Sequence, residues 1–83
     1  MKLFELVSKI PHPDIDVIVY SKGKIELFDT TIFKLHIYLR KLKNKRIKNL
    51  NPIEYLLKYS NISTIQIYSD CIYITLEDTL EID

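Results

Sequence analysis

Few residues in this 83-residue chain can carry chemistry: it holds two histidines and one cysteine. A histidine acts as a general base only when a partner within hydrogen-bond reach sets its pKa. His12 lies between two prolines and His36 lies in an amphipathic segment, so we interpret both as ordinary surface or edge residues. Cys71 follows Asp70, whose carboxylate raises the pKa of a nearby thiol. We therefore interpret Cys71 as a structural cysteine and not as a nucleophile.

Two pairs of neighbouring carboxylates are the next candidates, Asp14 with Asp16 and Glu77 with Asp78. Metal binding and glycosidase chemistry need carboxylates that converge across a cleft together with further ligands. Asp14 and Asp16 could bind a hard cation weakly, but charge at a solvated strand edge explains them more simply. One cysteine and two histidines also fall short of the usual four ligands of structural zinc. The sequence therefore predicts a protein without catalytic residues, metal or cofactor, and not an enzyme.

The densest charge lies in residues 40–48, called here the basic segment, where six of nine residues are basic and none is acidic. Such a segment suits an anionic partner, either a nucleic acid or an acidic protein surface. It equally suits a solvated helix C-terminus, where the helix dipole favours cations. Tyr38 could stack on a base, but no signature of a known nucleic-acid-binding motif accompanies it. The candidate partner-binding residues of this segment are Arg40, Lys41, Lys43, Lys45, Arg46 and Lys48.

The chain is rich in tyrosine, with six tyrosines and no tryptophan. Tyr68 and Tyr73 fall on the same side of a predicted hairpin, opposite its apolar side. Exposed tyrosines on a rigid sheet often form a binding surface, because they offer a large contact area at a low entropic cost. Cross-strand pairing of the two rings, which would stabilise the hairpin, is the equal alternative. Tyr68 and Tyr73 are therefore the second set of candidate partner-binding residues.

The composition indicates a folded domain that positions these residues. The chain is 47% hydrophobic and 28% charged, and its length predicts a single domain over residues 1–83. Its only glycine, Gly23, excludes the glycine-rich phosphate loops of Rossmann and P-loop proteins. No apolar run is long enough to cross a membrane and no signal peptide is visible. We therefore expect a cytoplasmic protein that does not act on a membrane.

Three segments predict helices. Residues 3–10 carry apolar side chains at helical spacing before the break at Pro11-His12-Pro13. Residues 32–46 fit either an alternating strand or a helix, and the cap-forming residues 29–31 favour the helix. The buried face of that helix would carry Ile32, Leu35, Leu39 and Leu42. Pro52 suits the first position of a short helix over residues 53–59.

Two further regions predict β-hairpins. Residues 15–20 and 25–28 flank Gly23, which we expect to supply the positive φ of the turn. Residues 62–68 and 72–76 alternate around a turn at residues 69–71. One face of this second hairpin carries Ile65, Ile67, Ile72, Ile74 and Leu76. The predicted fold is α+β, with the two hairpins forming a small, mainly antiparallel four-stranded sheet and two to three helices on one face.

The net charge of +1 conceals two segregated blocks. The basic segment holds six basic residues, whereas residues 70–83 hold five acidic residues and no basic one. The two blocks could pair with each other in the fold, or each could face a partner. We expect the acidic tail, residues 77–83, to fray.

The order of elements suggests a resemblance. The chain begins with a short helix (MKLFEL, residues 1–6), continues with a hairpin (VIVYSKGK, residues 17–24) and closes with a second one (IQIY and IYI, residues 65–68 and 72–74). It also has 14 isoleucines, 10 lysines and no alanine, which is typical of an AT-rich genome. In this pattern the chain resembles short α+β proteins of phages and mobile elements of low-GC bacteria. The resemblance implies direct binding to a host protein, for example as an anti-CRISPR inhibitor of a host defence system.

The sequence thus predicts a small non-catalytic binding protein that inhibits or modulates a host protein, such as a CRISPR or other defence effector, by occluding its surface. The partner could itself be a nucleic-acid-binding effector. The alternative is a nucleic-acid-binding protein that uses the basic segment. A homodimer is also open, because an edge strand of so small a sheet invites pairing with a second copy.

Overall fold

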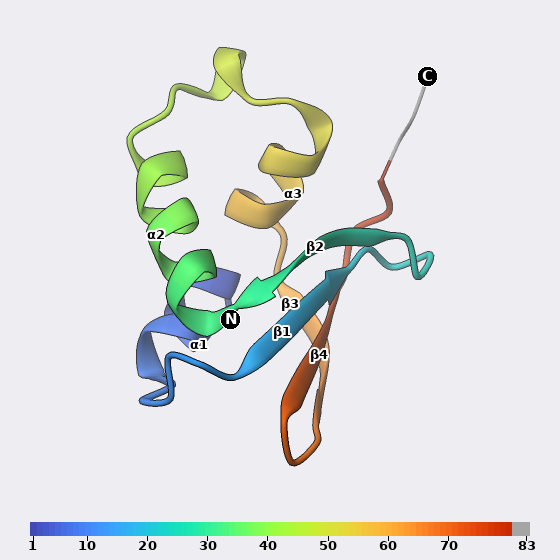
Figure 1. Ribbon diagram of the computed structural model, residues 1–83. Helices are drawn as coiled ribbons and strands as arrows, with labels where there is room; N and C mark the ends of the chain where they lie inside the picture. The colour runs from blue at the N-terminus through green and yellow to red at the C-terminus, as the bar shows by residue number, and fades with distance from the viewer. Residues whose placement is uncertain (81–83) are drawn as a thin grey trace.

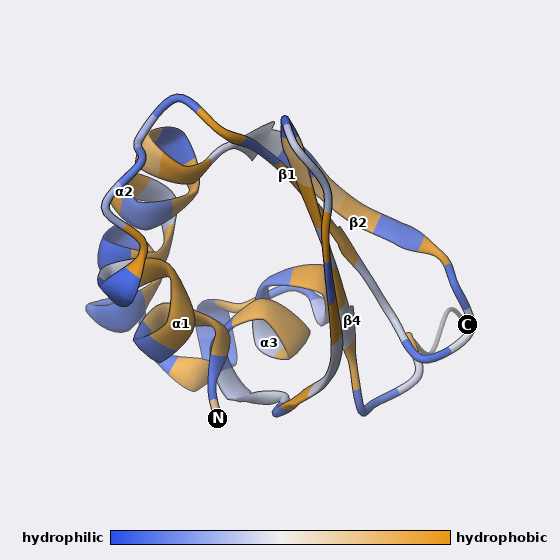
Figure 2. Cartoon of the chain, turned by 90° about the horizontal axis from the view of Figure 1, so that it is seen from below, coloured by the Kyte–Doolittle hydropathy of each residue, from blue (hydrophilic) through white to orange (hydrophobic). Residues whose placement is uncertain are grey.

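The structure is a computed structural model in which residues 1–80 are described. These residues form two layers, a sheet of four strands and three α-helices that all cover the same face of that sheet (Figure 1, Figure 2). The helices are α1 (Leu3–Lys9), α2 (Ile32–Lys43) and α3 (Pro52–Tyr59), with a short 3-10 helix, η1 (Ile47–Asn49), between α2 and α3. The strands are β1 (Asp16–Tyr20), β2 (Glu26–Thr31), β3 (Ile62–Ile67) and β4 (Cys71–Leu76). The α+β class is therefore confirmed.

The sheet has the strand order β2-β1-β4-β3 and is mixed. Strands β1 and β2 pair antiparallel, as do β3 and β4, but the central pair β1–β4 is parallel. The prediction of a mainly antiparallel sheet is corrected at this central pair. The two hairpins are joined by α2, η1 and α3, and so long a connection does not restrict the direction in which β4 meets β1. In the parallel pairing Val17 lies beside Ile72 and Val19 beside Ile74, and all four side chains are buried on the face that the helices cover.

The turn between β1 and β2 differs from the prediction in one residue. Gly23 does not have a positive φ, whereas Lys24 has a φ of 64°. The turn is held by the Ser21 N–H, which donates to the Ile25 carbonyl at 2.9 Å, and by the Lys24 N–H, which donates to the Ser21 carbonyl at 3.0 Å. A register shift between Val19 and Tyr20 adds a residue to β2 just after this turn. The prediction that Gly23 supplies the positive φ of the turn is therefore wrong.

Residues 32–43 form a helix, as the cap-forming residues indicate. Of those residues only Thr31 caps it: its hydroxyl oxygen accepts the Lys34 N–H at 3.3 Å, while Asp29 and Thr30 lie within β2. The helix ends at Lys43, so residues 44–46 form a loop and not the predicted last turn. Its predicted face is confirmed, since the buried residues are Ile32, Leu35, Leu39 and Leu42.

Helix α3 begins where the proline predicts. Pro52 occupies its first turn, and the side chain of Asn51 accepts the Glu54 N–H at 2.8 Å. The Glu54 carboxylate in turn accepts the Asn51 N–H at 3.0 Å, which completes a capping box. This reciprocal pair fixes the point at which the chain leaves the η1 loop and enters α3.

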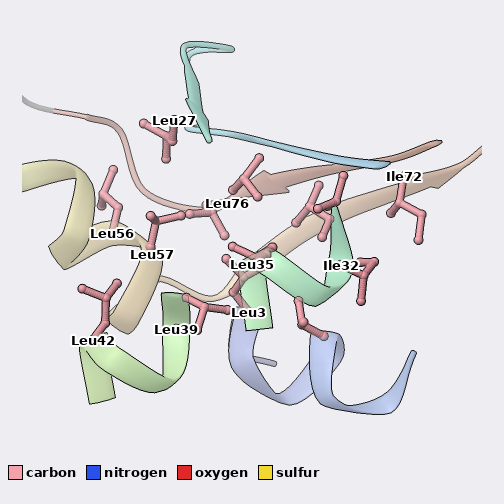
Figure 3. Packing of buried hydrophobic residues seen from close by; sticks show 14 of the residues in the cluster. Leu3, Leu27, Ile32, Leu35, Leu39, Leu42, Leu56, Leu57, Ile72 and Leu76 are labelled. Atoms are coloured by element: carbon pink, nitrogen blue, oxygen red, sulfur yellow. The ribbon is translucent and has the colours of Figure 1, made fainter. Parts of the chain in front are cut away.

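The core lies between the helices and the covered face of the sheet (Figure 3). Leu3 from α1, Leu35 from α2 and Leu57 from α3 are all fully buried against it. From the sheet, Ile74 and Leu76 of β4 are fully buried as well. Each helix thus contributes a leucine to the same core, and β4 lies beneath it.

The apolar face of the second hairpin is only half covered. The register places Ile65 opposite Ile74 and Ile67 opposite Ile72, so these residues share a face as predicted. Ile72 and Ile74 are buried, but Ile65 is 41% exposed and Ile67 is 75% exposed. The helices therefore cover β4 and leave the side chains of the edge strand β3 in solvent.

Part of the tail that the sequence predicts to fray is bound to the domain. The Glu77 N–H donates to the Asn61 carbonyl at 2.9 Å, and the Lys22 N–H donates to the Asp78 carbonyl at 3.0 Å. Leu80 is buried in the core cluster. Residues 81–83, the remainder of that tail, lie outside the described residues. Within residues 1–80, no helix has both the length and the apolar character needed to cross a membrane.

Candidate binding surfaces

The basic segment runs over the end of α2, the following loop and η1. Arg40, Lys41 and Lys43 belong to the last turns of α2. Lys45 and Arg46 lie in the loop, and Lys48 lies in η1. All six side chains are exposed. The cations at the C-terminus of α2 are also favoured by its dipole, so the structural and the binding interpretation both apply there.

Lys45 is held by an ion pair with Glu54. Its ammonium donates to both oxygens of the Glu54 carboxylate, Oε2 at 2.9 Å and Oε1 at 3.2 Å. The Asn51 N–H and Lys45 together lower the pKa of the Glu54 carboxyl below its usual range. Among residues 1–80, this is the one ion pair. Lys45 therefore ties the loop to α3.

Lys43 is engaged by its own domain too. Its ammonium lies 5.1 Å from the centre of the Phe4 ring, within the range of a cation–π contact. The backbone carbonyls of Lys43 and Lys45 accept hydrogen bonds from the Lys58 ammonium at 3.3 and 2.9 Å. In the basic segment, four cations neither pair with a described acidic side chain nor make a cation–π contact: Arg40, Lys41, Arg46 and Lys48.

Tyr38 does not belong to the exposed part of this surface. Its ring stacks on Phe28 with the ring centres 4.8 Å apart, and its hydroxyl group donates to Glu54 at 3.4 Å. Burial and the nearby Glu54 carboxylate raise the pKa of the Tyr38 hydroxyl. The suggestion that Tyr38 stacks on a nucleic-acid base is therefore not supported, because its ring face already has a partner.

The outward side of α2 carries apolar residues that the sequence analysis did not single out. Phe33, in the first turn of α2, is 55% exposed, and Ile37, near its middle, is 39% exposed; both lie outside the buried face of the helix. Ile37, Arg40, Lys41 and the C-cap Asn44 line a shallow hollow on this side. We call the row formed by Phe33, Ile37, Arg40, Lys41 and Asn44 the outer stripe of α2. The sequence does contain a signal for this row, because Phe33 and Ile37 are four residues apart and both fall outside the predicted buried face of the helix.

Tyr68 and Tyr73 lie on the other layer of the molecule, on the face of the sheet that carries no helix. Their ring centres are 5.2 Å apart, and the Tyr73 ring also lies 6.2 Å from that of Tyr20. The predicted cross-strand ring contact is therefore present, and Tyr20 extends it onto β1. Tyr68 remains exposed at the β3–β4 turn. This turn and the η1 loop lie at opposite ends of the molecule (Figure 1), so the two predicted sets of site residues do not meet.

The candidates for catalysis are dispersed. Removal from water raises the pKa of the Cys71 thiol, and the nearby Asp16, Asp29 and Asp70 carboxylates raise it further. His36 packs against Phe4 with the ring centres 5.5 Å apart. Within the described residues, no group of three or more histidine, cysteine, aspartate or glutamate side chains is placed to hold a metal ion.

No protein-family model, curated protein or solved structure matches this chain. Its function is therefore inferred from the side chains that its fold presents. The outer stripe of α2 combines exposed apolar area with Arg40 and Lys41, which have no acidic partner within residues 1–80. Arg46 and Lys48 follow along the chain in the loop and in η1. The tyrosines on the open face of the sheet offer exposed aromatic area without positive charge of their own.

Proposed function

We propose that this protein is a small non-catalytic binding protein that inhibits or modulates a host protein by covering part of its surface. The docking face is the outer stripe of α2, and Arg46 and Lys48 follow it along the chain in the loop and η1. The observation that carries the proposal is the exposure of Phe33 and Ile37 on the side of α2 where Ile37 lines a hollow with Arg40 and Lys41. The matching partner surface has an apolar patch bordered by acidic side chains.

The apolar residues favour a protein partner over a nucleic acid. Burying an exposed phenylalanine or isoleucine completely stabilises a complex by about 1.5–3 kcal/mol, and a protein surface can provide that burial. A phosphate backbone interacts with the cations but leaves an aliphatic side chain such as Ile37 without a partner. The mixture of apolar and basic residues on one helix is what an acidic, partly apolar protein surface would bind.

The resemblance to phage and mobile-element proteins suggests where to look for this partner. Proteins of that kind often act on host defence systems, so a CRISPR or other defence effector in the host cytoplasm is the first candidate. Such an effector would be occluded by direct contact, without any chemical step.

The proposal is tested by capture of proteins from host lysate, with identification by mass spectrometry after nuclease treatment. We expect a discrete partner that survives the nuclease. Affinity for the purified partner should then fall at least about tenfold in the variant R40E/K41E and in the variant F33S/I37S. The variant K22E/K24E changes the net charge equally in the β1–β2 turn, on the opposite side of the molecule from α2 (Figure 1), and should bind normally. Equal loss in all three variants, or normal binding by both stripe variants, would contradict the assignment of this surface.

Nucleic-acid binding by the basic segment remains the second proposal, because five of its six cations lack an acidic partner among the described residues. Counterion release predicts that such binding weakens steeply as the salt concentration rises. A gel shift at low salt, lost in R40E/K41E but retained in F33S/I37S, would favour this function over a protein partner. The absence of any shift at low salt would exclude it.

The tyrosines on the open face form a separate candidate surface. If the partner docks there, the variant Y68A/Y73A should lose capture while R40E/K41E retains it. The same set of variants thus distinguishes the two faces of the molecule.

A further inference from the structure

Strand β3 is an edge strand that no charged residue protects. The chain has no charged residue from Ser60 to Ser69, and the side chains of residues 63–67 are all exposed. Edge strands usually carry charges, prolines or bulges that prevent pairing with another chain. The opposite edge strand, β2, follows this rule with Glu26 and Asp29. A register shift interrupts β3 only near its start, between Ile62 and Thr64. The remainder of β3 therefore has neither a charge nor a bulge to prevent pairing.

The part of β3 available for pairing follows from its hydrogen bonds. At its start, the Ile62 N–H donates to the Met1 carbonyl at 2.8 Å, and Lys2 bridges to Asn61, so the N-terminal residues occupy that end. Near its end, the Tyr68 N–H donates to the Cys71 carbonyl at 2.8 Å. Because backbone direction alternates along an antiparallel ladder, Ile65 and Ile67 direct their N–H and C=O groups away from β4. We call residues 63–67 the free edge.

The side chains of the free edge are also suited to pairing. Ile65 and Ile67 lie on the helix-covered face of the sheet but beyond the helices, and they are 41% and 75% exposed. They continue the apolar row of Ile72 and Ile74 outward. An added strand would bury both isoleucines and satisfy the outward backbone groups.

We propose that β3 pairs antiparallel with β3 of a second copy of this chain, about a two-fold axis at Gln66. In that register Ile65 of each copy lies opposite Ile67 of the other copy. Four isoleucines therefore lie together on one face of the joined sheet. Both isoleucines then exchange backbone hydrogen bonds across the axis, and Gln66 lies opposite Gln66 of the second copy. The sheet runs continuously through both copies.

Charge explains why a second copy fits this edge. On the outer side of the free edge, Lys2 lies at its start, where its ammonium also donates to the Tyr59 carbonyl, and Asp70 lies in the turn after its end; Glu77 contacts Asn61 from the β4 side. Antiparallel pairing brings the start of one strand to the end of the other, so each charge approaches its opposite. Strand β2 is less suited to pairing with itself, because that would gather the Glu26 and Asp29 carboxylates of two copies along one seam.

The oligomeric state tests the proposal. Light scattering or sedimentation of the purified protein should give twice the chain mass of 9.9 kDa at high concentration and the chain mass on dilution. The variant I65K/I67K should remain a monomer throughout, because pairing would bring four ammonium groups together. The control I25K/I47K changes two exposed isoleucines elsewhere and should still form the dimer. A wild-type protein that is a monomer at every concentration, or an I65K/I67K variant that still dimerises, overturns the proposal.

The register is tested by cross-linking in a Cys71→Ser background. Directly opposed residues of a non-hydrogen-bonded pair have Cα atoms about 4.5 Å apart, within disulfide range. Gln66→Cys should therefore form a disulfide-linked dimer on mild oxidation. Ser63→Cys, whose counterpart in the second copy is several residues away, should not. Cross-linking through position 63 but not through position 66 overturns the assigned register.

Discussion

Lys24 holds a backbone conformation that a residue with a Cβ atom adopts only at a cost. Its φ of 64° lies in the left-handed region, which costs a non-glycine residue roughly 1–2 kcal/mol. Its neighbour Gly23 has no positive φ, and no atom lies within 4 Å of the place where its Cβ would be. Gly23 would tolerate the left-handed region, but the turn requires that conformation one position later, at Lys24.

Substitutions at these two positions should both stabilise the protein. Lys24→Gly relieves the strain and should raise the free energy of unfolding by about 0.5–1 kcal/mol. Gly23→Ala reduces the freedom of the unfolded chain and should add about 0.4–1 kcal/mol. Urea denaturation measures both, with Lys24→Ala as the control that keeps a Cβ atom and should bring no such gain. Strong destabilisation by Gly23→Ala would mean that the glycine is the left-handed residue after all.

At the scale of elements, the entry into α3 depends on one carboxylate. Glu54 completes the capping box with Asn51 and binds Lys45 from the loop, so it joins the start of α3 to the basic segment. Helix α2 supplies the hydroxyl of Tyr38 as a further donor to the same carboxylate. Loss of this charge would release the loop from α3 as well as weaken the cap.

This carboxylate makes stability depend on pH in the acidic range. Folding lowers the pKa of Glu54 below its usual 4.5, so its contribution is complete well above pH 4.5 and is lost as the pH falls through the lowered pKa. The stability difference between the wild type and Glu54→Gln should therefore be largest at neutral pH and shrink below pH 4.5. Thermal denaturation over a pH series measures it, with the exposed Glu26→Gln as the control. A difference that is constant with pH would show that the charge of Glu54 does not matter.

At the scale of the whole molecule, the helices cover the sheet unequally. Ile74 lies in a central strand and is fully buried, while Ile67 of the edge strand is 75% exposed, although the two share one face of the sheet. A chain of this length has a total stability of only about 4–12 kcal/mol, so a single core residue carries a large share of it. The uncovered part of the face is also where a second copy is proposed to bind.

The same substitution at the two isoleucines should therefore have very different results. Ile74→Ala leaves a cavity between the layers and should cost about 2–5 kcal/mol of stability. Ile67→Ala should change the stability of the dilute monomer by no more than about 0.5 kcal/mol. Chemical denaturation at low protein concentration measures both. Similar losses at the two positions would contradict the arrangement of the helices over β4.

Much of the local structure is determined by the sequence itself. Apolar spacing located the three helices and both hairpins. Residues 29–31 and Pro52 marked where α2 and α3 begin, because capping depends on near neighbours. The buried face of α2 followed from the same periodicity. Within the predicted site, the sequence identified the cations of the basic segment and offered the contact between the rings of Tyr68 and Tyr73 as one of two equal alternatives.

Only the tertiary structure decided how these parts combine. The parallel pairing of β1 with β4 joins residues more than fifty positions apart, and no local preference determines its direction. Packing of the helices against β4 buried Ile74 and left Ile67 exposed, although both belong to the same alternating pattern. The ion pair with Glu54 engages Lys45 within the domain. The exposure of Phe33 and Ile37 adds apolar area to the candidate binding surface on α2. Burial and long-range pairing depend on which surfaces meet, and that is a property of the folded chain as a whole.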